Sequence, residues 1–171
     1  MFRNCVKLSS FDFNKTFPTT IEETNITCMF GNVEPSAFYN TALSAIKSEN
    51  LTSIEDYAFA NCRSLSSIEL NALTTCKKYA FANNINLSTI SLPNAEFLQD
   101  HIFDNCANIT NLSIEKCTSI KGDTFANCGA DNLSIYAPMV SAVLENGFRN
   151  CNAEYIELSN DVAILSGNNA F

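Results

Sequence analysis

Cysteine is the residue with the most evident chemical potential in this sequence, which contains eight of them among 171 residues. A structural zinc site needs four converging ligands, with about 2.3 Å between zinc and each sulfur. No Cys-x-x-Cys pair occurs, and the one histidine is His101. Five cysteines recur at one place in a repeated unit: Cys5, Cys62, Cys106, Cys128 and Cys151. Cysteines that recur in this way form a line one repeat apart, so we expect no metal site.

A catalytic site is not predicted either. Nucleophilic catalysis needs a serine or cysteine beside a base and an orienting group. His101 stands at a variable position of the repeat, where we expect an exposed turn. Carboxylate pairs such as Glu22-Glu23 fall in expected loops, and the five glycines form no phosphate-binding loop. The sequence therefore predicts a protein that is not an enzyme and binds no cofactor.

The redox state of the cysteines leaves one alternative open. Cysteines one repeat apart would be separated by about one strand spacing of 4.8 Å, within the window of about 4.4–6.8 Å between Cα atoms that a disulfide allows. Stacked side chains point the same way, however, so we expect reduced cysteines inside the protein, with an occasional bridge as the alternative. Cys28, Cys76 and Cys117 lie outside this column, and cysteine suits such buried sites as a small hydrophobe.

The elements that must position these residues form an internal repeat of about 22 residues. The repeat is marked by phenylalanine at Phe38, Phe59, Phe81, Phe103, Phe125, Phe148 and Phe171. Asparagine stands two residues after every one of these phenylalanines except the last, and cysteine usually follows it. We expect the phenylalanines to fill the core, and the asparagines to bond backbone groups of their own and the neighbouring coil.

Each repeat also contains one stretch with the period of a β-strand, Leu-x-x-Ile-x-Leu, as at Leu65–Leu70. No helical run of ten residues fits in the remainder, which favours turns or 3₁₀ pieces. A single short strand must pair with its equivalent in the next repeat, which predicts a parallel solenoid. We expect one domain, residues 1–171, of about seven repeats, with an irregular insertion at 14–28 as a further candidate binding loop.

These columns resemble the BspA-like, or treponemal-type, leucine-rich repeats, whose unit resembles Leu-x-x-Ile-x-Ile-Pro-x-x-(V/I)-x-x-Ile-x-x-x-Ala-Phe-x-(N/G)-Cys. The best match runs from Leu65 to Phe81 with Asn83, and Leu87–Pro93 supplies the strand followed by proline. The Ala-Phe pair appears at Ala37-Phe38, Ala58-Phe59, Ala80-Phe81 and Ala170-Phe171. The resemblance implies a right-handed leucine-rich-repeat β-solenoid, used for adhesion or protein recognition in surface proteins of bacteria and protists.

The residues between the apolar positions of the strand should project to solvent and form the recognition surface. Their central column is expected to read Asp12, Lys47, Glu69, Ser91, Ser113, Ser134 and Glu157. The predicted partner-binding residues are Ser67, Glu69, Asn71, Thr89, Ser91, Asn111, Ser113, Glu115, Ser134, Tyr136, Tyr155 and Glu157. Tyr136 and Tyr155 give this surface one aromatic spot of the kind that interface hot spots favour. For any single residue, an inert solvated face is an equally good interpretation.

Charge and hydropathy narrow the class of partner. A formal net charge of −8 argues against nucleic acid and anionic membranes, and no apolar run is long enough to cross a bilayer. We therefore expect a protein or glycoprotein ligand. The family resemblance favours a cell-surface or extracellular location, whereas the missing apolar signal segment and the reduced cysteines favour the alternative, a cytoplasmic scaffold. The repeat array shows no obvious polar cap at its ends. We therefore expect that the chain is a segment of a larger array or that it associates end to end with itself.

Overall fold

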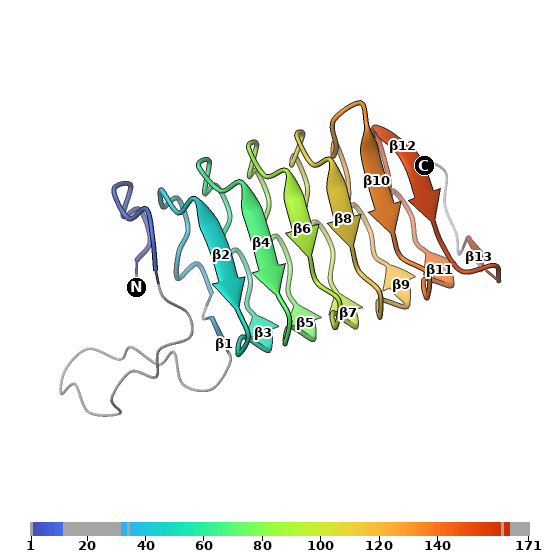
Figure 1. Cartoon of the computed structure of the whole chain (residues 1–171), viewed down its shortest axis with the longest axis horizontal. Coiled ribbons are helices and arrows are strands. Elements are labelled where there is room, and N and C mark those ends of the chain that lie inside the picture. The colour runs from blue at the N-terminus through green and yellow to red at the C-terminus, as the bar shows by residue number, and fades with distance from the viewer. Residues whose placement is uncertain (1, 12–31, 34, 162, 165–171) are drawn as a thin grey trace.

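The protein folds as a parallel β-solenoid, in a computed structural model that describes residues 2–11, 32–33, 35–161 and 163–164. One side is a six-stranded sheet in which strands of successive repeats pair in parallel and in chain order (Figure 1). Its strands are β2 (Ala45–Ser48), β4 (Ser67–Leu70), β6 (Thr89–Ser91), β8 (Asn111–Ser113), β10 (Leu133–Tyr136) and β12 (Ala153–Glu157). The predicted pairing of each strand with its equivalent in the next repeat is confirmed.

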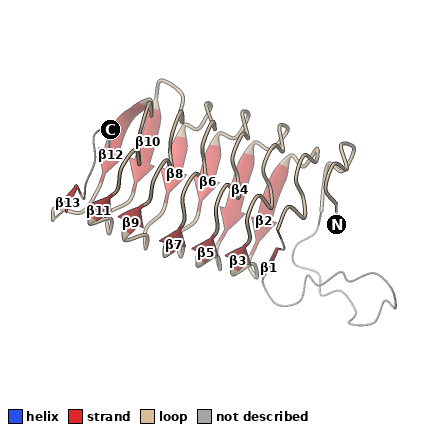
Figure 2. Ribbon diagram, turned by 180° about the vertical axis from the view of Figure 1, so that it is seen from behind, coloured by secondary structure: helices blue, strands red, loops and turns tan. Residues whose placement is uncertain are grey.

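The opposite side carries a second, shorter strand in each repeat, as Figure 2 shows from behind. One sheet contains β1 (Asn32–Val33), β3 (Ser53–Ile54), β5 (Thr75–Cys76) and β7 (Phe97–Leu98), and another contains β9 (Ser119–Ile120), β11 (Ala142–Val143) and β13 (Ala163–Ile164). The expectation of one strand per repeat was therefore incomplete, because two extended residues suffice to pair with the next coil. The described ranges contain no helix, so they hold no helix that could span a membrane. The predicted insertion at 14–28 lies outside the described residues.

A ladder of stacked phenylalanine rings fills the core, as predicted. Neighbouring rings from Phe38 to Phe148 lie 5.1–5.7 Å apart between centroids and within 12° of parallel. Leucine and isoleucine side chains of the broad sheet, such as Leu65 and Ile68, are almost fully buried. Burying one such side chain contributes roughly 1.5–3 kcal/mol, and a well-placed aromatic pair adds about 0.5–1.5 kcal/mol. Each coil can bury these groups only by stacking on a neighbour.

The asparagine column has a different role from the one expected. Every asparagine of this column, from Asn40 to Asn150, has a positive φ, for example 59° at Asn61 and 61° at Asn83. Their side chains bond to side chains of the preceding coil instead of backbone groups: Asn105 Nδ2 donates to Asn83 Oδ1 at 3.0 Å, and Asn127 Nδ2 donates to Asp104 Oδ1 at 3.3 Å. These side chains are half-buried or exposed rather than inside the coil. Asparagine is selected here because it tolerates the left-handed conformation that the turn requires.

The cysteine column is a row of hydrogen-bond donors. Cys62 Sγ donates to the carbonyl oxygen of Phe38 at 3.0 Å, and Cys106 Sγ donates to that of Phe81 at 3.2 Å. In the repeat between them, Asn84 replaces cysteine, and its Nδ2 donates to the Phe59 oxygen at 3.0 Å. This position therefore needs a small side chain that donates a hydrogen bond to a carbonyl oxygen of the preceding coil. The requirement explains why Asn84 can replace cysteine there, which a purely hydrophobic position would not. The cysteines of the described ranges are unbridged.

The two ends of the described solenoid differ. Near the N-terminus, Phe2 stacks on Phe38 at 5.1 Å and Phe11 packs edge-on against the same ring at 4.9 Å. In the last coil, Ile156 and Leu158 are half-buried, although the equivalent residues in earlier coils are buried. The last coil is therefore less covered by described residues than the coils before it. End-to-end association stays a prediction.

Candidate recognition surfaces

The broad face, defined as the outward side chains of β2, β4, β6, β8, β10 and β12, is the surface that the sequence predicts for recognition. Strand pairing arranges these residues in two columns. One column reads Ala45, Ser67, Thr89, Asn111, Ser134 and Tyr155. The other reads Lys47, Glu69, Ser91, Ser113, Tyr136 and Glu157. The remaining predicted residues, Asn71 and Glu115, follow β4 and β8. Asp12 lies outside the described residues.

One assignment within these columns was wrong. Ser134 was expected in the central column, but it pairs with Asn111, and Tyr136 takes the central place beside Ser113. The reason is the loop after Cys128. Gly129 adopts φ 94°, and Leu133 packs so closely that a Cβ on this glycine would lie 2.4 Å from its side chain. Ile135 lies ten residues after Phe125, whereas its partner Leu112 lies nine residues after Phe103, so the loop holds one extra residue before β10.

The corrected register makes Tyr136 and Tyr155 diagonal neighbours on adjacent strands, with Glu157 beside Tyr136. Tyr136 is 43 % exposed and Tyr155 is 57 % exposed. The Tyr155 hydroxyl donates to Glu157 Oε2 at 3.2 Å, and this hydrogen bond raises the pKa of Tyr155. We call Tyr136, Tyr155 and Glu157 the aromatic patch.

The rest of the broad face is more polar and partly self-paired. At the β2 end, Lys47 Nζ lies 2.9 Å from Glu69 Oε2, and this contact raises the pKa of Lys47. Asn71 Nδ2 donates to both carboxylate oxygens of Glu49 at 3.0 Å. The middle strands carry small side chains, of which Ser113 donates to Glu115 at 3.3 Å. The broad face therefore grades from paired charges through hydroxyl groups to the aromatic patch.

A second surface, the turn edge, is formed by the residues that flank each buried phenylalanine. Tyr57, Tyr79 and His101 stand two residues before theirs and all have positive φ values of 57–60°. Their rings stack at centroid distances of 4.8 Å and 4.4 Å. The sequence reasoning missed this stack, although an aromatic ring at the same position of three consecutive repeats was visible in the columns.

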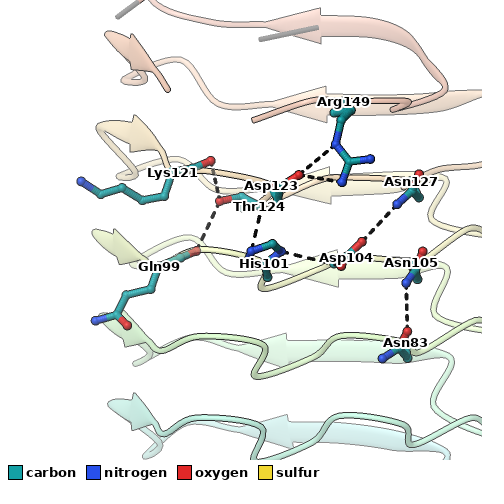
Figure 3. Close-up of polar contacts among 10 residues, drawn as sticks. All are labelled: Asn83, Gln99, His101, Asp104, Asn105, Lys121, Asp123, Thr124, Asn127 and Arg149. Carbon is teal, nitrogen blue, oxygen red and sulfur yellow. Dashed lines mark hydrogen bonds and ion pairs between the residues drawn. The ribbon is translucent and has the colours of Figure 1, made fainter. Parts of the chain in front are cut away.

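His101 lies within a polar network of the turn edge that Figure 3 shows. Its Nδ1 lies 3.7 Å from Asp104 Oδ2, and its Nε2 lies 3.9 Å from Asp123 Oδ2 in the next coil. Arg149 donates from Nε and Nη2 to Asp123 Oδ1 at 3.0 Å and 2.8 Å. The expected turn position of His101 is confirmed, but its side chain is 27 % exposed rather than open to solvent. We interpret this network as a link between coils, because Asp123 contacts His101 of the preceding coil and Arg149 of the following one.

The turn edge also contains a polar pocket of about 300 Å³ lined by Tyr39, Asn40, Asn61 and Arg63. Asn61 Nδ2 donates to the Tyr39 hydroxyl at 2.6 Å. The guanidinium carbon of Arg3 lies 5.0 Å from the centroid of the Tyr39 ring. Within the described ranges, no group of three or more His, Cys, Asp or Glu side chains is placed to hold a metal ion.

The repeat, its strand pairing and its phenylalanine ladder agree with a family model described as the BspA-type leucine-rich repeat region, which matches six copies over residues 31–153 and 96–171. The chain belongs to the BspA-type leucine-rich-repeat family. This family and fold are typically non-enzymatic and suggest a protein-interaction module.

Among solved structures, the chain is similar to the crystal structure of a T. pallidum leucine-rich repeat protein, TpLRR, with a TM-score of 0.65 and 19 % sequence identity. The match covers 82 % of this chain and 66 % of that chain. At this identity the likeness shows the leucine-rich-repeat fold alone. No curated protein sequence matches this chain.

Proposed function

We propose that this BspA-type solenoid is a non-catalytic adhesion or recognition module of a cell-surface or secreted protein, and that its broad face binds a protein or glycoprotein ligand. The observation that carries the proposal is the aromatic patch. Two tyrosines on adjacent strands are about half-exposed on a face whose other outward residues are small or charged. Exposed aromatic residues of this kind are enriched among interface hot spots.

The strands make this patch a prepared binding surface. Tyr136 and Tyr155 project from paired strands, so their backbones lose little freedom when a ligand binds. Tyrosine also has few rotatable bonds, and it combines an apolar ring with a hydroxyl group. The acidic side chain of Glu157 beside them favours a ligand with a basic or hydroxyl-bearing contact group.

The size of the broad face sets a further requirement on the ligand. Six strands spaced about 4.8 Å apart span about 24 Å, and four residues along a strand span about 13 Å. The resulting area of about 300 Å² is well below the roughly 800 Å² per partner of a standard protein interface. A stable complex therefore needs a ligand that extends past the strands onto flanking residues such as Asn71 and Glu115.

A second candidate function is an intracellular scaffold that binds a protein through the same face. The unbridged cysteines of the described ranges support this alternative, because surface proteins in oxidising compartments more often carry disulfides. Both candidates use the same contact residues and differ in where the protein resides.

Photo-crosslinking tests the binding face in cells of the source organism. A benzoylphenylalanine probe in place of Tyr155 should give a discrete crosslinked product with one partner. The matched control carries the same probe in place of Phe97, which is 62 % exposed. Phe97 belongs to β7, on the opposite side of the solenoid from the broad face. Products of equal yield from both positions, or no product from position 155, would contradict binding through the broad face.

Antibody labelling separates the two candidates. An antibody against the folded chain should label intact cells if the module is an adhesin, and the purified chain should then compete with cell attachment. Labelling that requires permeabilised cells would contradict the adhesin and favour the scaffold.

A further inference from the structure

Cys128 and Cys151 differ from the other cysteines of their column. The thiols of Cys62 and Cys106 point back along the solenoid and donate to carbonyl oxygens of the preceding coil. The Cys128 thiol instead lies beside that of Cys151, its equivalent in the next coil, and this neighbour is the largest cause of the raised pKa of Cys128. The two cysteines are therefore neighbours across the boundary between the last two coils that contain the column, where Asn152 N donates to the carbonyl oxygen of Cys128.

The backbone geometry brings the pair within the range of a disulfide. Asn152 N donates to the carbonyl oxygen of Cys128 at 2.9 Å, which places the two chain segments directly side by side. Three residues earlier, the rings of Phe125 and Phe148 lie 5.3 Å apart. A Cα separation of about 5 Å falls within the window for a disulfide, and the Cβ atoms need to approach to roughly 3.5–4.5 Å. Parallel side chains about 4.8 Å apart must therefore move together by less than about 1 Å.

The last coil is the part of the solenoid best able to make that movement. Cys106 lies in a coil that is paired on both sides, whereas β12 pairs with β10 alone among the described strands. Ile156 and Leu158 of the last coil are only half-buried. Cys151 is also half-buried, while Cys128 is buried, so an oxidant reaches the pair through Cys151.

We propose that Cys128 and Cys151 are a disulfide-forming pair that joins the last two coils when the protein meets a low-molecular-weight disulfide such as oxidised glutathione. The bridge would restrain the coil that described neighbours cover least. This inference does not depend on the identity of the ligand or on the binding face.

The exchange proceeds in two balanced steps. The Cys151 thiolate attacks one sulfur of oxidised glutathione, forms a mixed disulfide and releases one glutathione thiolate. Cys128 then loses its proton to solvent, its sulfur attacks Cys151 Sγ, and the second glutathione leaves as a thiolate. Two protein thiols are oxidised and one glutathione disulfide is reduced to two thiols.

The closeness of the two thiols sets the order of these steps. The neighbouring thiol of Cys128 lowers the pKa of Cys151, which therefore ionises first. The thiol of Cys151, together with burial, raises the pKa of Cys128. Because the thiolate is the attacking species, the first attack comes from Cys151, the more accessible cysteine.

Peptide mapping tests the pair directly. The folded chain is treated with oxidised glutathione, its remaining free thiols are alkylated, and it is digested with trypsin. Cleavage after Lys121 and Arg149 puts the two cysteines in separate peptides, residues 122–149 and 150–171, each with one cysteine. We expect these peptides to be joined and two hydrogens lighter than their sum. The thermal midpoint should rise by about 5–10 °C, because the bridge closes a loop of intermediate length.

Two variants control this experiment. Cys151→Ala alters a half-buried site. In this variant Cys128 should remain a free thiol and be alkylated, and the thermal midpoint should not respond to oxidised glutathione. In Cys106→Ala, the other neighbour of Cys128 is removed and the joined peptides should persist. Glutathione attached to Cys151 with Cys128 fully alkylated, a link between Cys106 and Cys128, or a link that forms only in denaturant would each overturn the proposal.

Discussion

Among the described residues of the broad face, the outward side chains of β6, β8, β10 and β12 stand beside each other without hydrogen bonds between coils, and pairing is confined to Lys47–Glu69 and Asn71–Glu49 near β2. On the turn edge, polar side chains of neighbouring coils pair with one another. Thr89, Ser91 and Tyr136 make no side-chain hydrogen bond with the described residues. On the turn edge, by contrast, Arg149 bonds to Asp123, and asparagine side chains bond to side chains of the preceding coil. The comparison indicates that the turn edge uses its polar groups to join coils, which leaves the broad face available for a ligand.

Backbone conformation explains this division. Positions of the turn edge adopt positive φ values, which restrict them to residues that tolerate the left-handed region. Outward positions of the broad face lie on ordinary strands, where almost any side chain fits. The broad face can therefore vary from repeat to repeat while the fold is kept.

The largest expected effect comes from the core that both surfaces share. Phe81→Ala removes a fully buried ring from the middle of the ladder, between Phe59 and Phe103. We expect the free energy of unfolding in urea to fall by about 3–5 kcal/mol. Phe97→Ala is the matched control, because Phe97 is 62 % exposed, and it should change stability by less than about 0.5 kcal/mol. Similar losses for both variants would contradict the ladder as the main support of the coils.

Alkaline pH should lower the free energy of unfolding through the buried thiol of Cys106. Burial raises the pKa of Cys106 from 9.0 to about 12. Between these values the unfolded chain has lost this proton and the folded chain has kept it. Stability contributed by the buried thiol is therefore full below about pH 9 and falls as pH rises, by about 1.4 kcal/mol per pH unit. Urea unfolding at pH 10 and pH 11 should show this steeper decline in the native protein than in Cys106→Ala. Equal slopes would contradict a proton retained by the folded state.

A smaller effect distinguishes backbone conformation from hydrogen bonding in the asparagine column. Asn83 has φ 61°, and its Oδ1 accepts from Asn105. Asn83→Ala should cost about 1 kcal/mol because alanine is strained in the left-handed region. Asn83→Gly loses the same side-chain bond but tolerates the conformation, so its loss should be less than about 0.5 kcal/mol. If glycine destabilises as much as alanine in urea unfolding, the side-chain bond is the more important contribution.

The sequence allowed the fold to be predicted because buried positions repeat with a fixed period. Phe59, Leu65 and Ile68 were assigned to the core from spacing alone, and all three are buried. The second strand of each repeat was missed because two residues such as Ser53-Ile54 carry no alternation that periodicity can detect. The donor role of the cysteine column depends on carbonyl groups of another coil, which no single repeat reveals.

The candidate site was predicted less completely for a related reason. Apolar positions fix which residues face outward, but the register of β10 depends on the loop around Gly129 and its packing on Leu133. Counting residues from Phe125 therefore placed Ser134 where Tyr136 lies. The network of His101 with Asp104 and Asp123 joins residues of different coils that share no motif. Variable positions of this kind are assigned only when the coils are seen together.

The smallest effect on stability and the largest on binding are expected at the aromatic patch. Tyr136→Ser combined with Tyr155→Ser should change the free energy of unfolding by less than about 0.5 kcal/mol, because both rings are about half-exposed. Binding to the crosslinked partner should weaken at least about tenfold, since aromatic hot spots commonly contribute 2 kcal/mol or more.

Tyr57 of the turn edge provides the matched control for this variant, because it is 42 % exposed, nearly the same as Tyr136. Tyr57→Asn keeps a residue that tolerates the positive φ of this position, and it should leave the dissociation constant unchanged within about threefold. Calorimetric titration of both variants with the partner decides between the two surfaces. Loss of binding in Tyr57→Asn with normal binding in the double variant would place recognition on the turn edge, because exposure is matched and only the surface differs.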